Sequence, residues 1–333
     1  MKRQRRRLIG GALAATASAA LPPALTSAFA QAQGYPARPI KIIVPFPAGG
    51  TTDIAARLVA QRMSESMGQQ VVVENRGGAG GSIGADAVAK SPPDGYTLLM
   101  HNITFPVSGV SLAKQKRLPY DMEKDFAGVS IAVNVPFVVT AHPSVPAKDL
   151  RELAELLRKD KSLQYNYGST GPGSIMHVLG EAFKTAANVE MTHVPFRGAA
   201  PLKLELLSGR IQVGGDQLSS SLAEIRAGQL KALATSSAKR SSALPDVPTV
   251  RELGFAQLEF EGWNGLFVPA RTPKEIIDRL HQETVRAVNH PEVKQRFADL
   301  AAEAVGSTPK EQEAIVKLQM DQFRPVIEKL TLD

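Results

Sequence analysis

Short apolar runs alternate with longer stretches of helical spacing along the chain from residue 40 onward. A short apolar run bounded by turn residues is typical of a buried strand, whereas apolar residues three or four positions apart indicate the inner face of a helix. Strands that alternate with helices predict βαβ units and a mostly parallel sheet. The first such region has predicted strands at 40–44, 71–74 and 97–100, predicted helices at 54–67 and 83–90, and a segment predicted to be irregular at 102–125.

A second alternating region begins with the apolar segment 129–140 and ends near the proline-rich residues 244–248. An extended piece at 259–268 follows it and leads into a helical C-terminal part. The remaining predicted strands are 163–167, 189–194 and 210–214, and the remaining predicted helices are 147–160, 174–187, 201–208, 273–289, 291–302 and 309–330.

Two candidate crossings between these regions predict the domain organisation. They lie near 129–135 and 261–266, so we expect a first lobe made of residues 34–128 plus 262–333 and a second lobe, 129–261, inserted into it. Ligands of such α/β sheets bind beyond the carboxyl ends of the strands, and two lobes of this kind would form a cleft there.

The N-terminal residues indicate an export signal rather than a part of the fold. Basic residues at 2–7 precede an alanine-rich apolar stretch at 8–25, and small residues at 28–30 suit signal cleavage. We therefore predict that residues 1–30 are a signal peptide cleaved near Ala30 and that the mature protein is periplasmic. The adjacent arginines also suit the twin-arginine route, so the Sec and Tat routes both stay open.

Charge and cysteine content narrow the function classes. The chain has 39 Lys and Arg against 32 Asp and Glu, but five of the basic residues lie in the predicted leader, which leaves 34 against 32. This balance provides no concentrated basic face for a nucleic acid. The chain has no Cys, and its six His show no ligand spacing, so we predict neither a metal site nor a cofactor.

The turn at 45–53 carries the most informative chemistry. It follows the predicted strand 40–44 and opens a predicted helix, whose first amides are unpaired and carry a partial positive charge. Glycines let the backbone approach closely, so main-chain donors alone can hold a carboxylate or phosphate here. For Asp53, a structural role at the helix start is an equal alternative. The candidate ligand-binding residues of this first turn are Phe46, Ala48, Gly49, Gly50, Thr51, Thr52 and Asp53.

A second glycine turn, at 168–177, repeats this chemistry between a strand and a helix. Two converging sets of N–H and hydroxyl donors could hold one carboxylate without a buried arginine, since charge-assisted hydrogen bonds contribute roughly 1.5–3 kcal/mol each. The plainer alternative is a pair of ordinary turns capped by Ser or Thr, but their matched positions favour a ligand site. For His177, packing or capping is the alternative role. The candidates here are Ser169, Thr170, Gly171, Gly173, Ser174 and His177.

Three other features bear on function. Arg197, followed by Gly198 and Ala199, is a candidate partner for a second carboxylate, or else a surface arginine before a helix. The G-x-S-x-G pattern at 80–84 matches a nucleophile elbow, but an elbow needs a sharp strand-to-helix turn at the serine, and this one lies too far from the preceding strand. Trp263 is interpreted as hinge packing rather than as a stacking platform.

Several segments, taken in order, make the chain resemble the Bug-type periplasmic solute receptors, the extracytoplasmic binding components of tripartite tricarboxylate transporters. They cover nearly the whole mature chain. The matching segments are Tyr35-Pro36 with Pro39-Ile40, PFPAGGTTD at 45–53, VENR at 73–76 with the following glycine run, DGYTLL at 94–99, LPYD at 118–121, 171–177, 195–200, and Pro269 with Thr272-Pro273.

The resemblance implies a two-lobe type II periplasmic-binding-protein fold that closes on a small carboxylate. It implies that the first turn and the Gly-Ser turn of the second lobe grip a carboxyl group, partly through ordered water, and that membrane permease subunits are partners. Ligands in the family range over amino acids, dicarboxylates, citrate-like acids and aromatic acids. One departure concerns the distal pocket: Gln212 stands where members commonly have an acid, and Asp216 follows as a candidate ligand-binding residue.

We therefore expect a non-enzymatic, monomeric receptor for an organic carboxylate. Two alternatives stay open. A secreted hydrolase would use Ser82 or Ser174 with a histidine base. A receptor domain of the same kind would signal to a sensor kinase instead of supplying a permease.

Overall fold

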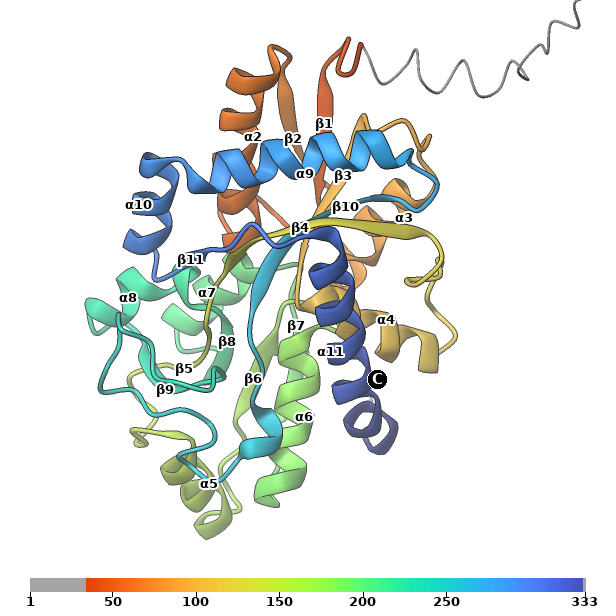
Figure 1. The fold of residues 1–333 in the computed structure, drawn as a ribbon. Helices are drawn as coiled ribbons and strands as arrows, with labels where there is room; N and C mark the ends of the chain where they lie inside the picture. Colours follow the sequence, from red (N-terminus) through yellow and green to blue (C-terminus); the bar gives the residue numbers. More distant parts are fainter. Residues whose placement is uncertain (1–33, 332–333) are drawn as a thin grey trace, which may run out of the picture. The chain divides into compact units, whose positions relative to one another are not determined.

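The computed structural model describes residues 34–331, so the predicted export signal lies outside the described residues. Within it, the described residues from Pro36 onward form one compact unit that contains two β-sheets (Figure 1). The first sheet has the strand order β11-β4-β10-β3-β1-β2. Its strands are β1 (Ile40–Val44), β2 (Val71–Asn75), β3 (Thr97–Asn102), β4 (Phe126–Asn134), β10 (Trp263–Pro269) and β11 (Glu303–Ala304).

The second sheet has the order β7-β6-β8-β5-β9. Its strands are β5 (Phe137–Ala141), β6 (Asn166–Ser169), β7 (Thr192–Pro195), β8 (Val213–Gln217) and β9 (Lys231–Thr235). In this sheet only β5 runs against its neighbours, while in the first sheet β10 and β11 run against the other four. Strands of one direction therefore predominate in both sheets, each of which also contains antiparallel pairs. We call the parts built on the two sheets the first lobe and the second lobe.

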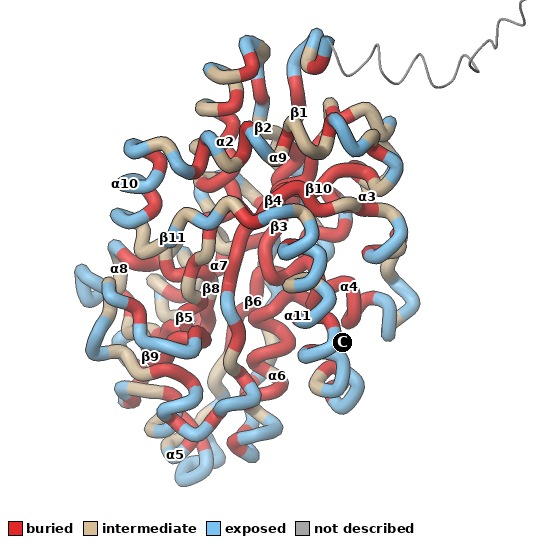
Figure 2. Tube along the Cα trace, viewed as in Figure 1, coloured by how far each residue is buried: buried red, intermediate tan, exposed pale blue. Residues whose placement is uncertain are grey.

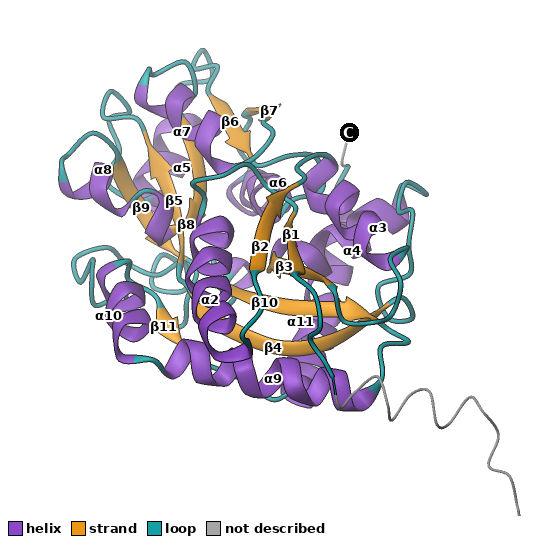
Figure 3. Ribbon diagram, turned by 90° about the horizontal axis from the view of Figure 1, so that it is seen from above, coloured by secondary structure: helices purple, strands orange, loops and turns teal. Residues whose placement is uncertain are grey.

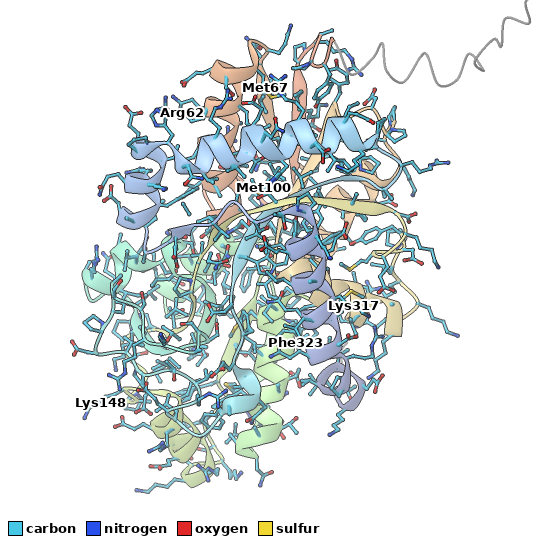
Figure 4. The ribbon with its side chains drawn as sticks, viewed as in Figure 1. Arg62, Met67, Met100, Lys148, Lys317 and Phe323 are labelled. Carbon is cyan, nitrogen blue, oxygen red and sulfur yellow. The ribbon has the colours of Figure 1, made fainter. Side chains whose placement is uncertain are left out.

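Helices flank both sheets, and α9 and α11 both pack against β4 (Figure 3). Buried residues follow the strands and the inner helix faces, as Figure 2 shows, and they include Met100 on β3 and Phe323 on α11 (Figure 4). The first lobe has α2 (Thr51–Met67), η1 (Ala79–Gly81), α3 (Ser82–Ala89), α4 (Thr104–Lys114), α9 (Lys274–Asn289), α10 (Pro291–Asp299) and α11 (Pro309–Lys329). The second lobe has α5 (Leu150–Lys159), α6 (Ile175–Ala187), α7 (Ala199–Leu207), η2 (Leu218–Ser220), α8 (Leu222–Arg226) and η3 (Ala256–Leu258).

Local sequence signals account for several helix ends. Asp149 caps α5, because its carboxylate accepts the N–H groups of Arg151 and Glu152. Thr308 and Glu311 form a capping box at the start of α11. Gly68 adopts a left-handed conformation directly after α2, which ends that helix.

The prediction that residues 102–125 are irregular is wrong for its first half, because α4 occupies Thr104–Lys114. This helix is buried on all sides along most of its length, so the sequence has no alternation of apolar and polar faces to reveal it. Its Gly109 lies against Met122, at a position where a Cβ atom would overlap the sulfur. Tertiary packing, rather than amphipathic pattern, forms this helix.

The chain changes sheet twice. It leaves the first sheet after Asn134 and enters the second at Phe137, and it returns between Thr235 and Trp263. The whole of β4 therefore belongs to the first sheet. Trp263, interpreted from the sequence as hinge packing, is buried at the return point, where its indole N–H donates to Gln319 Oε1 at 2.7 Å.

A buried chain of side-chain hydrogen bonds connects the two sheets beside these crossings. Asn264 on β10 donates to Gln217 Oε1 on β8 at 3.1 Å and accepts from Thr52 Oγ1 at 2.8 Å. The Thr52 hydroxyl accepts in turn from Asn102 Nδ2 at 2.9 Å, and Asn102 Oδ1 accepts the N–H of Thr104 at the start of α4. We call these five residues the hinge chain.

Replacing Asn264 with alanine should lower the free energy of unfolding by about 3 kcal/mol, because Gln217 and Thr52 would keep buried polar atoms without partners. Urea unfolding followed by circular dichroism measures this change. Asn289→Ala is the matched control, because Asn289 makes one exposed bond to the Val285 carbonyl. Equal effects of the two substitutions would contradict a special role of the hinge chain.

Candidate functional site

The first turn, between β1 and α2, is fixed from inside by Asp53. Its carboxylate accepts the N–H of Gly49 at 3.0 Å, Nδ2 of Asn75 at 2.9 Å, and Nε of Arg57. Burial alone would raise the pKa of Asp53, but the hydrogen bonds from Arg57, Gly49 and Asn75 hold it below its ordinary value. Of the two roles considered for Asp53, the geometry favours the one that holds the loop.

The two threonines of this turn also face inward. Thr51 Oγ1 lies 2.5 Å from Ser219 Oγ on η2, so this hydroxyl joins the first lobe to the second. Thr52 belongs to the hinge chain. Ala48 and Gly49 are exposed, and Gly50 approaches the start of α7, because a Cβ atom on it would lie 3.9 Å from Ala199 Cβ.

The second turn, between β6 and α6, is likewise held by its own side chains. Ser169 Oγ accepts the Gly171 N–H at 3.2 Å and lies 3.1 Å from the Gly171 carbonyl oxygen. His177 Nδ1 accepts the Gly173 N–H at 3.0 Å. Ser174 stands at the N-cap of α6 with its hydroxyl buried and without a hydrogen-bond partner among the described residues.

A third segment, the glycine-rich stretch around η1, brings the lobes together. A Cβ atom on Gly171 would lie 3.0 Å from the amide nitrogen of Gly80, and one on Gly80 would lie 2.7 Å from the Pro172 carbonyl oxygen. Nearby, a Cβ atom on Gly198 would lie 2.5 Å from the ring of Pro47. At Gly80 and Gly171 main chain thus meets main chain across the lobes, and at Gly198 main chain meets a proline ring, so each position leaves no room for a side chain.

A cavity of about 410 Å³ lies between these segments. Of the predicted site residues, Phe46, Thr170, Gly171 and Arg197 line it, and Arg197 is exposed with no ion pair to any described residue. Its other lining residues are Pro45, Gly77, Gly78, Ala79, Gly81, Ile83, Pro172, Pro195 and Phe196. The remaining candidates do not line it: Ala48, Gly49, Gly50, Thr51, Thr52, Asp53, Ser169, Gly173, Ser174, His177, Gly198, Ala199 and Asp216.

The sequence analysis did not predict Gly77–Ile83 as part of the site, because it used this glycine run only as a segment of the family resemblance and, at 80–84, as a rejected nucleophile elbow. The available signal was the density of glycine, since Gly78, Gly80 and Gly81 all have positive φ. A second cavity, of about 280 Å³, lies in the first lobe beside Phe105 and touches neither glycine turn.

His101 is another residue that the sequence did not single out. It is fully buried on β3, its Nδ1 accepts the Asn102 N–H at 2.8 Å, and its Nε2 has no partner among the described residues. A Cβ atom on Gly81 would lie 2.6 Å from that Nε2. Burial lowers the pKa of His101 to about 3, so the ring is neutral and carries its proton on Nε2, directly behind the cavity wall.

Gln212 and Asp216, the two residues that the sequence analysis connected with the distal pocket, both form hydrogen bonds with other groups of the protein. Gln212 accepts the Asn166 N–H with Oε1 and donates from Nε2 to the Gly209 carbonyl, both at 2.9 Å, so it ties β6 to the turn before β8. Asp216 accepts from Ser220 Oγ at 3.0 Å. Burial raises the pKa of Asp216 to about 6, although the Gln217 amide and the Ser220 hydroxyl act in the opposite direction.

The described residues contain no group of three His, Cys, Asp or Glu that could hold a metal ion, and none of their helices is long and apolar enough to cross a membrane. The architecture defines a class: two α/β lobes are joined by crossing strands (Figure 1). The lobes meet over a cavity lined by glycine-bearing segments. This is the arrangement of a two-lobe binding protein.

Comparison with known proteins gives the family. Residues 55–332 match the tripartite tricarboxylate transporter family receptor. The chain is 35% identical over 296 residues to Protein BugT of Bordetella pertussis, covering 89% of this chain and 90% of that protein. The chain therefore belongs to this receptor family, which confirms the resemblance found in the sequence.

Solved structures confirm the two-lobe periplasmic-binding-protein fold. A structure described as a periplasmic transporter is 40% identical with a TM-score of 0.85, covering 90% of this chain and all of that one. MatC from Rhodopseudomonas palustris with bound malate is 31% identical, with a TM-score of 0.83 and coverage of 88% and 100%. Rpa4515 from R. palustris with adipate is 32% identical, with a TM-score of 0.82 and coverage of 88% and 97%.

The raised pKa of Asp216 predicts a pH-dependent effect of Asp216→Asn. A carboxyl whose pKa is higher in the folded state than its ordinary value of 3.8 contributes stability at low pH, and this contribution is lost as the pH rises through about 6. The substitution should therefore stabilise the protein by about 2 kcal/mol more at pH 8 than at pH 4, because each unit of difference in pKa corresponds to about 1.4 kcal/mol. Urea unfolding at both pH values measures this difference, and a difference of opposite sign would contradict it.

Proposed function

We propose that this protein is a periplasmic receptor that captures a small organic carboxylate between its lobes and presents the closed form to membrane permease subunits. Membership in the receptor family supports a solute-binding role and a periplasmic location. The bound malate and adipate of two similar structures support the carboxylate class. The predicted export signal, residues 1–30, is consistent with the proposed periplasmic location.

The observation that carries the proposal is the cavity between the glycine turns of the two lobes. It has unpaired positive charge at its edge, from Arg197, and main-chain segments in its wall, from Gly77–Gly81 and Thr170–Pro172. An arginine guanidinium binds a carboxylate through two parallel hydrogen bonds. About 410 Å³ is also a suitable size for a small acid.

The hydrolase alternative has no geometric support of this kind. Ser82 and Ser174 are both buried, and neither hydroxyl has a hydrogen bond to a histidine in the part of the chain that the structure describes. A signalling role would use the same ligand site, so it differs from the proposal only in the partner of the closed form.

A ligand screen tests the proposal directly. The mature protein, stripped of carried-over ligand by unfolding and refolding, should be stabilised by at least one acid from a panel of dicarboxylates, tricarboxylates, acidic amino acids and aromatic acids. A ligand at a hundred times its dissociation constant adds about 2.7 kcal/mol to the stability, which thermal shift and calorimetry detect. If no acid of the panel stabilises the protein, the carboxylate assignment is refuted.

Arg197→Gln should weaken binding of the best acid about tenfold, because it removes a charge-assisted hydrogen bond at the cavity edge. Calorimetry measures the affinity. Arg226→Gln is the control, since Arg226 is a basic residue of the same lobe that does not line the cavity. An Arg197 variant that binds like the control would remove Arg197 from the site.

Gly171→Ala should weaken binding roughly tenfold or more by pushing the two lobes apart, because the closed form would become less populated. The added Cβ would lie 3.0 Å from the Gly80 amide nitrogen. Gly254→Ala is the matched control: it also substitutes a positive-φ glycine of the second lobe, but has no atom within 4 Å of its Cβ position. Equal affinities of the two variants would show that the cross-lobe contact does not govern binding.

A further inference from the structure

Two imidazole rings lie face to face behind the second turn. His177 on α6 and His193 on β7 have ring centroids 3.8 Å apart and planes only 6° from parallel. His193 stacks in turn on Tyr167 of β6, with centroids 5.0 Å apart. The second turn, residues 169–174, is thus supported by an aromatic stack that spans two strands and a helix.

Each imidazole holds a different glycine of the turn. His177 Nδ1 accepts the Gly173 N–H at 3.0 Å, so this ring must be unprotonated at Nδ1. His193 Nε2 lies 2.7 Å from Ser169 Oγ, and that hydroxyl accepts the Gly171 N–H at 3.2 Å. The directions of both glycine amides therefore depend on the imidazole pair.

The turn needs such support because both glycines have positive φ, 137° for Gly171 and 72° for Gly173. Glycine leaves the backbone free to adopt many other conformations, and ordering it on binding would weaken the affinity. Gly171 lines the cavity and contacts Gly80 across the lobes. Fixing its position in advance therefore prepares the site for a ligand and for closure.

We propose that His177 and His193 are positioning residues that hold the second turn in its binding conformation, and that acid releases the ligand by protonating His177 and abolishing its bond to Gly173. The proposal rests on the proposed carboxylate receptor function. It deepens that function by assigning a pH response to the same site. In this proposal His177 does not touch the ligand. The family resemblance instead implies that His177 helps to bind the carboxyl group.

The groups around His177 favour its neutral form. Burial lowers the pKa of His177 to about 4, and the positive charge of Lys184 on α6 lowers it further. Glu181 on the same helix is paired with Lys184 and accepts the Tyr167 hydroxyl.

Among the described residues of the other elements packed on α6, the groups to consider are the uncharged Ser111 and the carboxyl of Asp216, whose pKa of about 6 leaves it ionised at neutral pH. From α4, the uncharged Ser111 donates to the Gly173 carbonyl at 3.1 Å. The carboxyl of Asp216 on β8 is bonded to Ser220. The direction of the effect follows: support for the turn is complete at neutral pH and is lost as the pH falls through about 4.

The test compares His177→Asn, which keeps a non-titrating acceptor oxygen, with His177→Leu, which removes the acceptor. With malate and adipate as probes at pH 7, His177→Leu should bind about tenfold more weakly than the parent, and His177→Asn within about threefold of it. Between pH 7 and pH 3 the parent should lose about tenfold more affinity than His177→Asn, because protonation of His177 with a pKa of about 4 is nearly complete only at pH 3. Comparing the two proteins at the same pH cancels the titration of the probe itself. His142→Asn, at a half-buried histidine of the second lobe that does not line the cavity, is the control.

A ligand-free measurement separates this inference from the proposed function. Hydrogen exchange at the Gly173 amide should be at least about tenfold faster in His177→Leu than in the parent, and nearly unchanged in His177→Asn. His193→Phe, which keeps a ring but not the bond to Ser169, should speed exchange at the Gly171 amide. Unchanged exchange in His177→Leu, or identical pH curves of the parent and His177→Asn, would overturn the positioning role. A parent that binds neither these probes nor any acid of the screen would instead overturn the receptor proposal.

Discussion

The hinge chain is the interaction on which the rest of the structure depends. Its hydrogen bonds run from Gln217 in the second sheet, through Asn264 in the crossing strand, to Thr52 at the start of α2. These groups are buried, so none of them can exchange its partner for water without a large loss of free energy. The hinge chain therefore fixes where α2 begins relative to both sheets. Because the first glycine turn leads into α2, the hinge chain also fixes one wall of the cleft.

The contacts across the cleft are made by small groups. Gly80 meets Pro172, and Gly198 meets Pro47, at distances that exclude any larger side chain. Such contacts bury little apolar surface, so by themselves they contribute little to the free energy of closure. In the proposed receptor, a ligand that touches both lobes would supply the remaining free energy of closure, because it would bind the closed form better than the open one. Under that proposal, glycine at these positions couples ligand binding to closure.

Local pattern predicted much of the fold and the place of the two turns, because strands and amphipathic helices leave a periodic signature. The strand β1 coincides with its predicted range of 40–44. Pattern failed for α4, which has no polar face. It also could not reveal the protein partners of the first turn, because Thr51 bonds a serine 168 positions away and Thr52 bonds an asparagine 212 positions away. A local sequence pattern carries no information about partners so distant. The contact of these threonines with a ligand stays a prediction.

The groups near the cavity suggest how an anion could be held there. His101 and His177 are neutral at pH 7, because burial lowers the pKa of both rings, and the Asp53 charge is satisfied inside the first turn. Near the cavity wall this leaves main-chain and hydroxyl dipoles, with Arg197 as an exposed charge at the edge. Salt screens an exposed charge strongly and affects buried dipoles much less. In the proposed receptor, a site of this composition would therefore fix the position of one carboxylate by shape and hydrogen bonding. The rest of the ligand would lie at the exposed edge, where the charge of Arg197 would favour acids with a second negative group.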